Sequence, residues 1–311
     1  MVVANVGVSP IQSVSAQSLP VTSPAQTSPQ LSLRVACAAN SQVRDRSFIA
    51  HQYASYPFRL SNALALAPDD PQRVYAYIMN AGPGLLAGDD LRMGVEVCDR
   101  ASLYLTDQSA TKVHSKPTGE PSAQMHCDLK VGRQAYLEYV LEPIILFPAA
   151  ALKQTTQIHL HAQAHLVLSE IVVPGRLAKG EFYLFDSFES RLQVRSPEGV
   201  LQFTDTQKLL GQSNPFRTHC FLTDYPVLGN FLIISPDLDL AQLSQLIHAT
   251  DVCRNIPGNT LQIGSSPLPN CHGLFVRAMA TQASVLKYFQ HHVLSIARQL
   301  LNQPPLPQIP K

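Results

Sequence analysis

Three stretches of this chain repeat one another in a degenerate form, and this repeat is the feature that most constrains the fold. Residues 95–106, 129–140 and 158–169 each consist of a strand, a tight turn, an alanine and a second strand. The alanines of the three units, Ala101, Ala135 and Ala164, lie 34 and then 29 residues apart. Apolar residues stand two and four places after each alanine. Stacked hairpins give such a register, so the repeat predicts a β-solenoid-like body of stacked hairpins.

Further strands and two late helices complete the predicted fold. Period-two alternation predicts strands at 31–35, 73–78 and 91–97, and a further hairpin spans 192–203. Apolar residues at three- and four-residue steps predict helices only near the C-terminus. The first is capped by Asp237 or Asp239 and continues to Ile247, and the second is capped by Thr281 and carries an apolar stripe from Val285 to Leu300. The fold class is therefore mainly β, a large irregular body with two C-terminal helices.

The composition divides the chain into three parts and limits its partners. Residues 1–30 carry no charge and few large side chains, which predicts a disordered tail, while 31–302 form one β domain and 303–311 a proline-rich end. A net charge of +1 with 14% charged residues disfavours nucleic acid as a partner. No stretch reaches the roughly 18 apolar residues of a membrane-spanning helix. Six scattered cysteines without a CxxC pair indicate reduced thiols, so we expect a cytoplasmic protein.

Two polar segments predict a recognition site at one edge of the sheet. The septet Thr106–Lys112 directly follows a strand, and the turn 82–89, with Gly82, Gly84, Gly88 and Asp89, lies one hairpin upstream. The turn lacks the Gly-Lys-Ser/Thr ending of a phosphate-binding loop, and Ala87 stands where a dinucleotide fingerprint needs glycine. If the hairpins stack, their second strands end together. The septet then gains acidic neighbours: Glu142 and Glu170.

Metal and acid–base chemistry have weaker candidates. We expect His159, His161 and His165 to share one strand face, and imidazoles suit nickel or zinc, but no carboxylate or thiolate lies within the run. A surface cluster is therefore favoured over a permanent metal site. Glu142, Glu170 and Glu181 could supply the paired carboxylates of a carbohydrate-active β-solenoid enzyme, although the chain has no tryptophan to stack on a sugar.

Four motifs in order resemble those of a known family. The turn Gly84–Asp89 is similar to a Gly-Gly-x-x-x-Gly-Asp turn, and Leu105–Lys112 to a Leu-Thr-Thr-Gln-x-x-Thr-Lys run in which Asp107 replaces the second threonine. A Glu followed by an Ile/Leu-Phe segment matches 142–147, and Gly-Arg-x-x-x-Gly-Glu matches 175–181. From about residue 31 to 302 the chain resembles the urease accessory proteins of the UreD family, called UreH in some organisms.

This resemblance implies a scaffold that is not an enzyme. Such proteins work with UreF and the GTPase UreG to load nickel into apo-urease. They have an irregular β body with two helices and no tightly bound cofactor, and nickel passes only transiently. A polar, water-filled route is implied, because weak oxygen ligands release nickel where imidazole or thiolate retains it. The candidates for this route and for the surface that faces the partners are Asp89, Thr106, Thr111, Lys112, Glu142, Glu170, Arg176 and Glu181.

Overall fold

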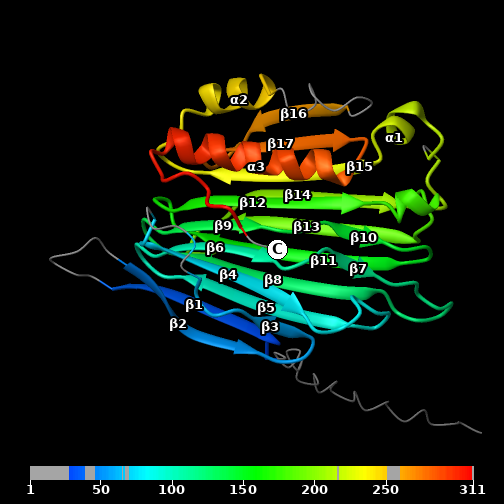
Figure 1. The fold of residues 1–311 in the computed structure, drawn as a ribbon, viewed down its shortest axis with the longest axis horizontal. Coiled ribbons are helices and arrows are strands. Elements are labelled where there is room, and N and C mark those ends of the chain that lie inside the picture. The colour runs from blue at the N-terminus through cyan, green and yellow to red at the C-terminus, as the bar shows by residue number, and fades with distance from the viewer. Residues whose placement is uncertain are drawn as a thin grey trace, which may run out of the picture.

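Two β-sheets packed face to face form the body of the molecule in a computed structural model of the chain (Figure 1). The structure describes residues 28–38, 46–64, 66, 70–215, 217–250 and 260–309. Most of the predicted disordered tail, residues 1–27, lies outside the described residues. The prediction of a mainly β fold is confirmed within the described part of the chain.

Both sheets mix parallel and antiparallel neighbours. Sheet A has the order β14 (Leu201–Leu210), β13 (Ser187–Arg195), β11 (Ala151–Leu160), β8 (Ala123–Val131), β5 (Asp90–Val97), β1 (Leu31–Ala38) and β2 (Arg46–Ala54). Sheet B has the order β16 (Leu261–Pro267), β17 (Gly273–Ala280), β15 (Val227–Ile234), β12 (His165–Val173), β9 (Tyr136–Val140), β6 (Ser102–Asp107), β4 (Arg73–Asn80) and β3 (Phe58–Leu60). The short strands β7 (Thr111–Val113) and β10 (Ile144–Leu146) extend sheet B beside β12.

The internal repeat sets the register of both sheets. Leu129 pairs with the equivalent residues of the preceding and following units in sheet A, Val95 and Ile158. Leu137 pairs in the same way in sheet B, with Leu103 and Leu166. These partners reproduce the predicted offsets of 34 and 29 residues, so the repeat units stack as the sequence predicts.

The predicted pairing within each unit is wrong, because the two strands of a unit lie in different sheets. β5 leads to β6, β8 to β9 and β11 to β12, and each turn carries the chain across the core from sheet A to sheet B. Apolar side chains of both strands then face each other between the sheets, where a hairpin would place them side by side in one sheet. The segment 192–203 is a true hairpin, in which β13 and β14 pair antiparallel.

Helices cover the outer face of sheet B. α2 (Leu240–His248) begins at Asp239, whose carboxylate accepts hydrogen bonds from two backbone amides, as predicted. α3 (Ala283–Leu300) begins at Gln282, and the predicted cap Thr281 is wrong, because its hydroxyl instead accepts from the Thr260 amide at 3.4 Å. α3 contacts β12, β15 and β17 and closes a second apolar core on this face (Figure 1).

Two short helices were not predicted: α1 (Cys220–Asp224) and the 3₁₀ turn η1 (Leu177–Lys179).

The proline-rich end of the chain packs on sheet B. After α3 the chain returns along the sheet, where the carbonyls of Pro304 and Pro305 accept from Arg298 at 3.2 Å. Leu306 packs against the second core. The end therefore adds to the cover of sheet B.

Candidate functional site

The predicted polar segments gather at the end of the molecule where β6, β9 and β12 finish (Figure 1). Parallel pairing brings Ile144 beside both Thr111 and Val172, which joins three separate segments of the chain. Two glycine turns pack against this edge. A Cβ on Gly84 would lie 2.3 Å from the Lys112 carbonyl oxygen, and one on Gly175 would lie 2.3 Å from that of Glu181. Both turns therefore need glycine for a close approach of two backbones.

Charged residues of these turns have structural partners. The Asp89 carboxylate accepts from the Leu86 amide at 2.8 Å and closes its own turn. Arg176 donates from Nε to the Glu181 carboxylate at 2.8 Å, and this hydrogen bond lowers the pKa of Glu181. The Arg176 guanidinium also lies 4.5 Å from the centroid of the Phe147 ring. Arg176 and Glu181 thus hold each other and fix the turn between them.

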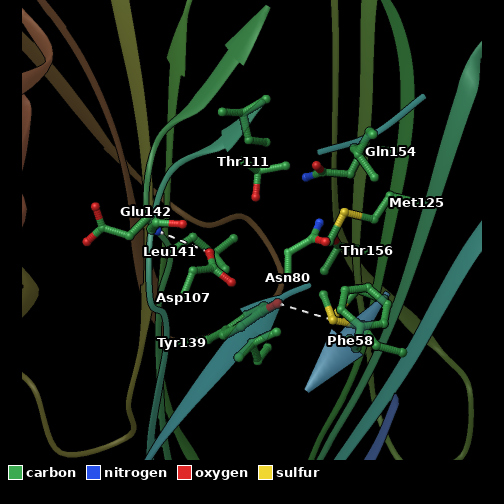
Figure 2. Close-up of a pocket in the computed structure, with 16 residues that line it drawn as sticks. Phe58, Asn80, Asp107, Thr111, Met125, Tyr139, Leu141, Glu142, Gln154 and Thr156 are labelled. Atoms are coloured by element: carbon green, nitrogen blue, oxygen red, sulfur yellow. Dashed lines mark hydrogen bonds between the residues drawn. The ribbon is translucent and has the colours of Figure 1, made fainter. Parts of the chain in front are cut away.

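A cavity of about 40 Å³ lies between the two sheets at this end (Figure 2). Polar side chains from both sheets line it: Asp107, Thr111, Gln154 and Thr156. Sulfur atoms and rings complete the wall, including those of Cys127, Met125 and Tyr139. Roughly 10–15 Å³ is enough for one water, so the cavity can hold water beside its polar groups.

Asp107 faces this cavity, whereas the carboxylate of Glu142 points away from it (Figure 2). The Glu142 amide donates to Asp107 Oδ2 at 3.2 Å, so the backbone of Glu142 closes the wall. Its carboxylate accepts from Lys287 Nζ on α3 at 2.8 Å. Of the two neighbouring acids, Asp107 therefore supplies the carboxylate at the cavity.

A second cavity of about 30 Å³ lies next to the first one between the sheets. The two share four wall residues: Tyr139, Leu141, Gln154 and Thr156. The second adds the carboxylates of Glu170 and Asp205 and the amide of Asn230. We call the polar side chains Asp107, Thr111, Gln154, Thr156, Glu170, Asp205 and Asn230 the interior layer.

Glu170 is a buried acid whose partners are amides. Gln154 Nε2 donates to one carboxylate oxygen, and Asn230 Nδ2 lies 3.4 Å from the other. Within the described residues no Lys, Arg or His pairs with Glu170, and burial raises its pKa although the two amides oppose the shift. Glu170 therefore differs from Asp205, which pairs with Arg277 at 2.6 Å.

The remaining predicted residues lie outside these two cavities. Thr106 is buried, and its hydroxyl lies 3.5 Å from the Asp107 carbonyl. Lys112 is exposed on β7, next to the Gly84 turn. Of the predicted route residues, Thr111 and Glu142 contribute to the first cavity and Glu170 to the second.

The expectation that three imidazoles share one strand face is wrong. His159 and His161 line a groove on the outer side of sheet A, whereas His165 is buried in sheet B. The turn between them crosses from one sheet to the other. His165 stacks on Tyr136 at 3.9 Å and lies 2.8 Å from the Ser235 hydroxyl. In the described part of the chain, no three His, Cys, Asp or Glu side chains group as a metal site.

The paired carboxylates of a glycosidase are not formed by Glu142 and Glu170. Glu170 faces Gln154 of sheet A between the sheets, while Glu142 faces α3 on the other side of sheet B. Two acids on opposite faces of a sheet cannot flank one glycosidic bond.

Gln154, Asn230 and Asp205 were missed as site residues, and Asp107 was expected at the shared sheet edge beside Glu142 but was not among the candidate site residues. A signal for Gln154 was present in β11, where Leu152, Gln154, Thr156 and Ile158 all face inward. Two polar residues within an otherwise apolar inward series mark a polar place in the core.

Comparison with known proteins decides the family. The family model described as "UreD urease accessory protein" matches residues 28–311. The chain belongs to the UreD family of urease accessory proteins. The UreD of Trichodesmium erythraeum is 40% identical over 281 residues, which cover 90% of this chain and 98% of that protein. The UreD of Haloarcula marismortui is 31% identical and covers 84% of both chains. The UreH of Helicobacter pylori is 26% identical over 83% of this chain and 92% of its own length.

The family assignment agrees with the resemblance found in the sequence. The predicted resemblance to UreD is confirmed, and the interior layer lies in the matched region. Among the described residues, neither α3 nor any shorter helix combines the length and the apolar character that a membrane span requires.

Proposed function

We propose that this UreD-family protein is a cytoplasmic scaffold that acts with UreF and the GTPase UreG to bind apo-urease and assist nickel insertion. Nickel is the cargo, and the interior layer is its route between the two sheets. The protein holds no resident cofactor and carries out no catalytic step. The carboxylates at the two cavities attract a divalent cation, and the amide and hydroxyl oxygens replace part of its water shell.

The observation that supports this proposal is the chemistry of the cavity walls. Carboxylate, amide and hydroxyl oxygens line both cavities, and such ligands bind nickel more weakly than imidazole or thiolate. Cys127 is the thiol at the first cavity, and burial raises its pKa to about 12. It is therefore a neutral thiol at physiological pH, and strong thiolate binding is avoided. A wall of this kind lets a cation pass.

The route is tested with substitutions that remove charge and keep shape. In the complex with UreF, UreG and apo-urease, Asp107→Asn and Glu170→Gln are expected to co-purify normally and to lower the nickel content and activity of urease. Asp128→Asn is the matched control, because Asp128 is exposed on sheet A. Normal nickel content in both interior variants would contradict the route. Glu142→Ala is less informative, because its carboxylate holds Lys287.

The partners are tested separately from the route. Co-purification with UreF, UreG and apo-urease is expected, and urease activity is expected to disappear when the protein is deleted. A stable monomer that none of these proteins binds would contradict the scaffold role, whatever the interior variants do.

A further inference from the structure

The second cavity reaches a seam where the two sheets meet through side chains alone. β14 is the last strand of sheet A, and its inward side faces β15 and β17 of sheet B. Gln207 accepts from Asn230 at 2.9 Å, and Asp205 accepts from Arg277 at 2.6 Å. Within the described residues no backbone ladder joins β14 to sheet B. The seam can therefore open without the loss of a single ladder hydrogen bond.

The inward side of β14 is polar in its middle, between Phe203 and Leu209, which pack against the core. Phe203 packs on Phe275 at one end of the seam, but Asp205 and Gln207 follow it along the strand. Asp205 and Asn230 also line the second cavity, so the side chains that close the seam are part of the cavity wall. A polar closure of this kind exchanges its contacts with water at a small net cost.

The ion pair at the seam lies between the cavity and solvent. The Arg277 side chain is 48% exposed and Asp205 is 21% exposed, whereas Glu170 behind them is 6% exposed. Arg277 also rests on the Phe275 ring, 5.2 Å from its centroid. A guanidinium that swings out to water would leave two carboxylates at an open mouth, Asp205 and Glu170.

We infer that the seam between β14 and β17 is an opening of the interior for a divalent cation, and that the Asp205–Arg277 pair is its latch. This inference rests on the proposed function, because the cation is the nickel that the interior layer carries. Closed, Arg277 neutralises Asp205 and repels a cation. When the pair is broken, the opening exposes carboxylate oxygens that can bind a cation.

The latch is tested first in the full chain without nickel or partners. Cys127 is buried at the first cavity, so its modification by a small neutral thiol reagent reports access to the interior. Arg277→Ala is expected to speed this modification severalfold, as followed by peptide mass spectrometry. Lys208→Ala is the matched control, because Lys208 lies on β14, the strand of Asp205, and pairs with Glu189 at 2.6 Å on the outer side of sheet A. Equal rates in the two variants would overturn the latch. If Arg277→Ala fails to fold, Asp205→Asn replaces it, because this variant keeps the side-chain shape and is also expected to speed the modification of Cys127.

Nickel loading separates this inference from the proposed function. In the complex with UreF, UreG and apo-urease, Arg277→Ala is expected to lower the nickel content of urease severalfold relative to Lys208→Ala, because the cation leaks to water. Normal loading by Arg277→Ala beside poor loading by Asp107→Asn would overturn the seam as a mouth and leave the route intact. Normal loading by both variants would overturn the route, and this inference with it.

Discussion

Two clusters of buried polar groups lie on opposite faces of sheet B, and they differ in how their charges are balanced. Beneath the end of α3, Arg298 holds Glu138, and Arg73 holds Asp70 at 2.9 Å. We call these four residues the arginine cluster. Between the sheets, the interior layer contains Glu170, whose partners are amides, and it surrounds two cavities. The first cluster pairs its acids with arginines, whereas in the second the buried Glu170 has only amide partners among the described residues.

The difference in charge pairing separates a cluster that stabilises the fold from the interior layer, which we propose as the route for nickel. A buried charge is tolerated when a paired opposite charge and hydrogen bonds offset its lost hydration. The arginine cluster meets this condition and ties α3 to sheet B. Glu170 meets it only in part, and a buried acid with amide partners beside a cavity is a candidate for a functional site. Three carboxylates therefore form a series: Glu138 with arginine, Glu142 with lysine and Glu170 with amides.

Removal of Arg298 has the largest expected effect on the free energy of unfolding. Arg298→Ala leaves the Glu138 carboxylate buried beside one fewer cation, and Arg298 itself is 2% exposed. Breaking a buried pair by removing one partner costs about 3–5 kcal/mol. Denaturant unfolding measures the loss, with Lys208→Ala as an exposed control that should change stability little. A loss as small as that of the control would show that the arginine cluster does not stabilise α3.

Removal of the lysine comes second. Lys287→Ala leaves Glu142 buried, but the lysine side chain is 35% exposed and water replaces part of its contact. We expect a loss of about 1–2 kcal/mol in the free energy of unfolding, because a hydrogen bond to a charged group contributes more than a neutral one. Interior access should not change, since the Glu142 carboxylate points away from the cavity. Faster labelling of Cys127 in this variant would place Lys287 in the wall instead.

The amide-bound acid has the smallest expected effect of the three. Glu170→Gln keeps a side chain that bonds with Gln154 and Asn230 once the Gln154 amide turns over. The loss of stability should stay within about 1 kcal/mol, because no buried cation is left without a partner. Glu138→Gln is the matched control and should cost several times more, since it leaves two arginines short of a carboxylate. Equal losses in the two variants would remove the contrast between the clusters.

The sequence predicts the stacking of the repeat but not which sheet each strand joins. Alternation and turn residues between Val95 and Thr106 suit a hairpin and a crossing turn equally well. Whether the turn forms a hairpin or crosses between the sheets depends on how the apolar faces of the two strands are buried against each other. The sequence of a single unit does not contain this information. Helix α1, at 220–224, is too short for an apolar period, so no pattern could predict it.

The sequence also predicts one end of the candidate site better than its interior. Thr111 and Glu142 were predicted because strand ends meet at one edge, and the pairing of β7 with β10 brings these segments together. Gln154 and Asn230 lie in mid-strand, 16 and 60 residues from Glu170. Only the packing of sheet A on sheet B brings such residues into contact.

The smallest expected difference between the two clusters is in how the free energy of unfolding depends on pH. Burial raises the pKa of Glu170 above its usual 4.5, so the folded protein holds this proton more tightly than the unfolded chain. Its contribution is complete below pH 4.5 and is lost as pH rises through the folded pKa. Burial alone would raise the pKa of Glu138 too, but Arg73 and Arg298 together lower it below 4.5. Its contribution is present above pH 4.5 and is lost as pH falls through the folded pKa.

These opposite signs predict opposite trends for the two variants. As pH rises from 4.5, Glu170→Gln should gain stability relative to the unsubstituted protein, because only the latter must ionise a buried acid. The deficit of Glu138→Gln should be largest above pH 4.5 and should shrink as the solution becomes more acidic. Unfolding free energies of the three proteins at several pH values measure both trends. Parallel curves would mean that Glu170 is ionised and neutralised as fully as Glu138, and the interior layer would then be a second stabilising cluster.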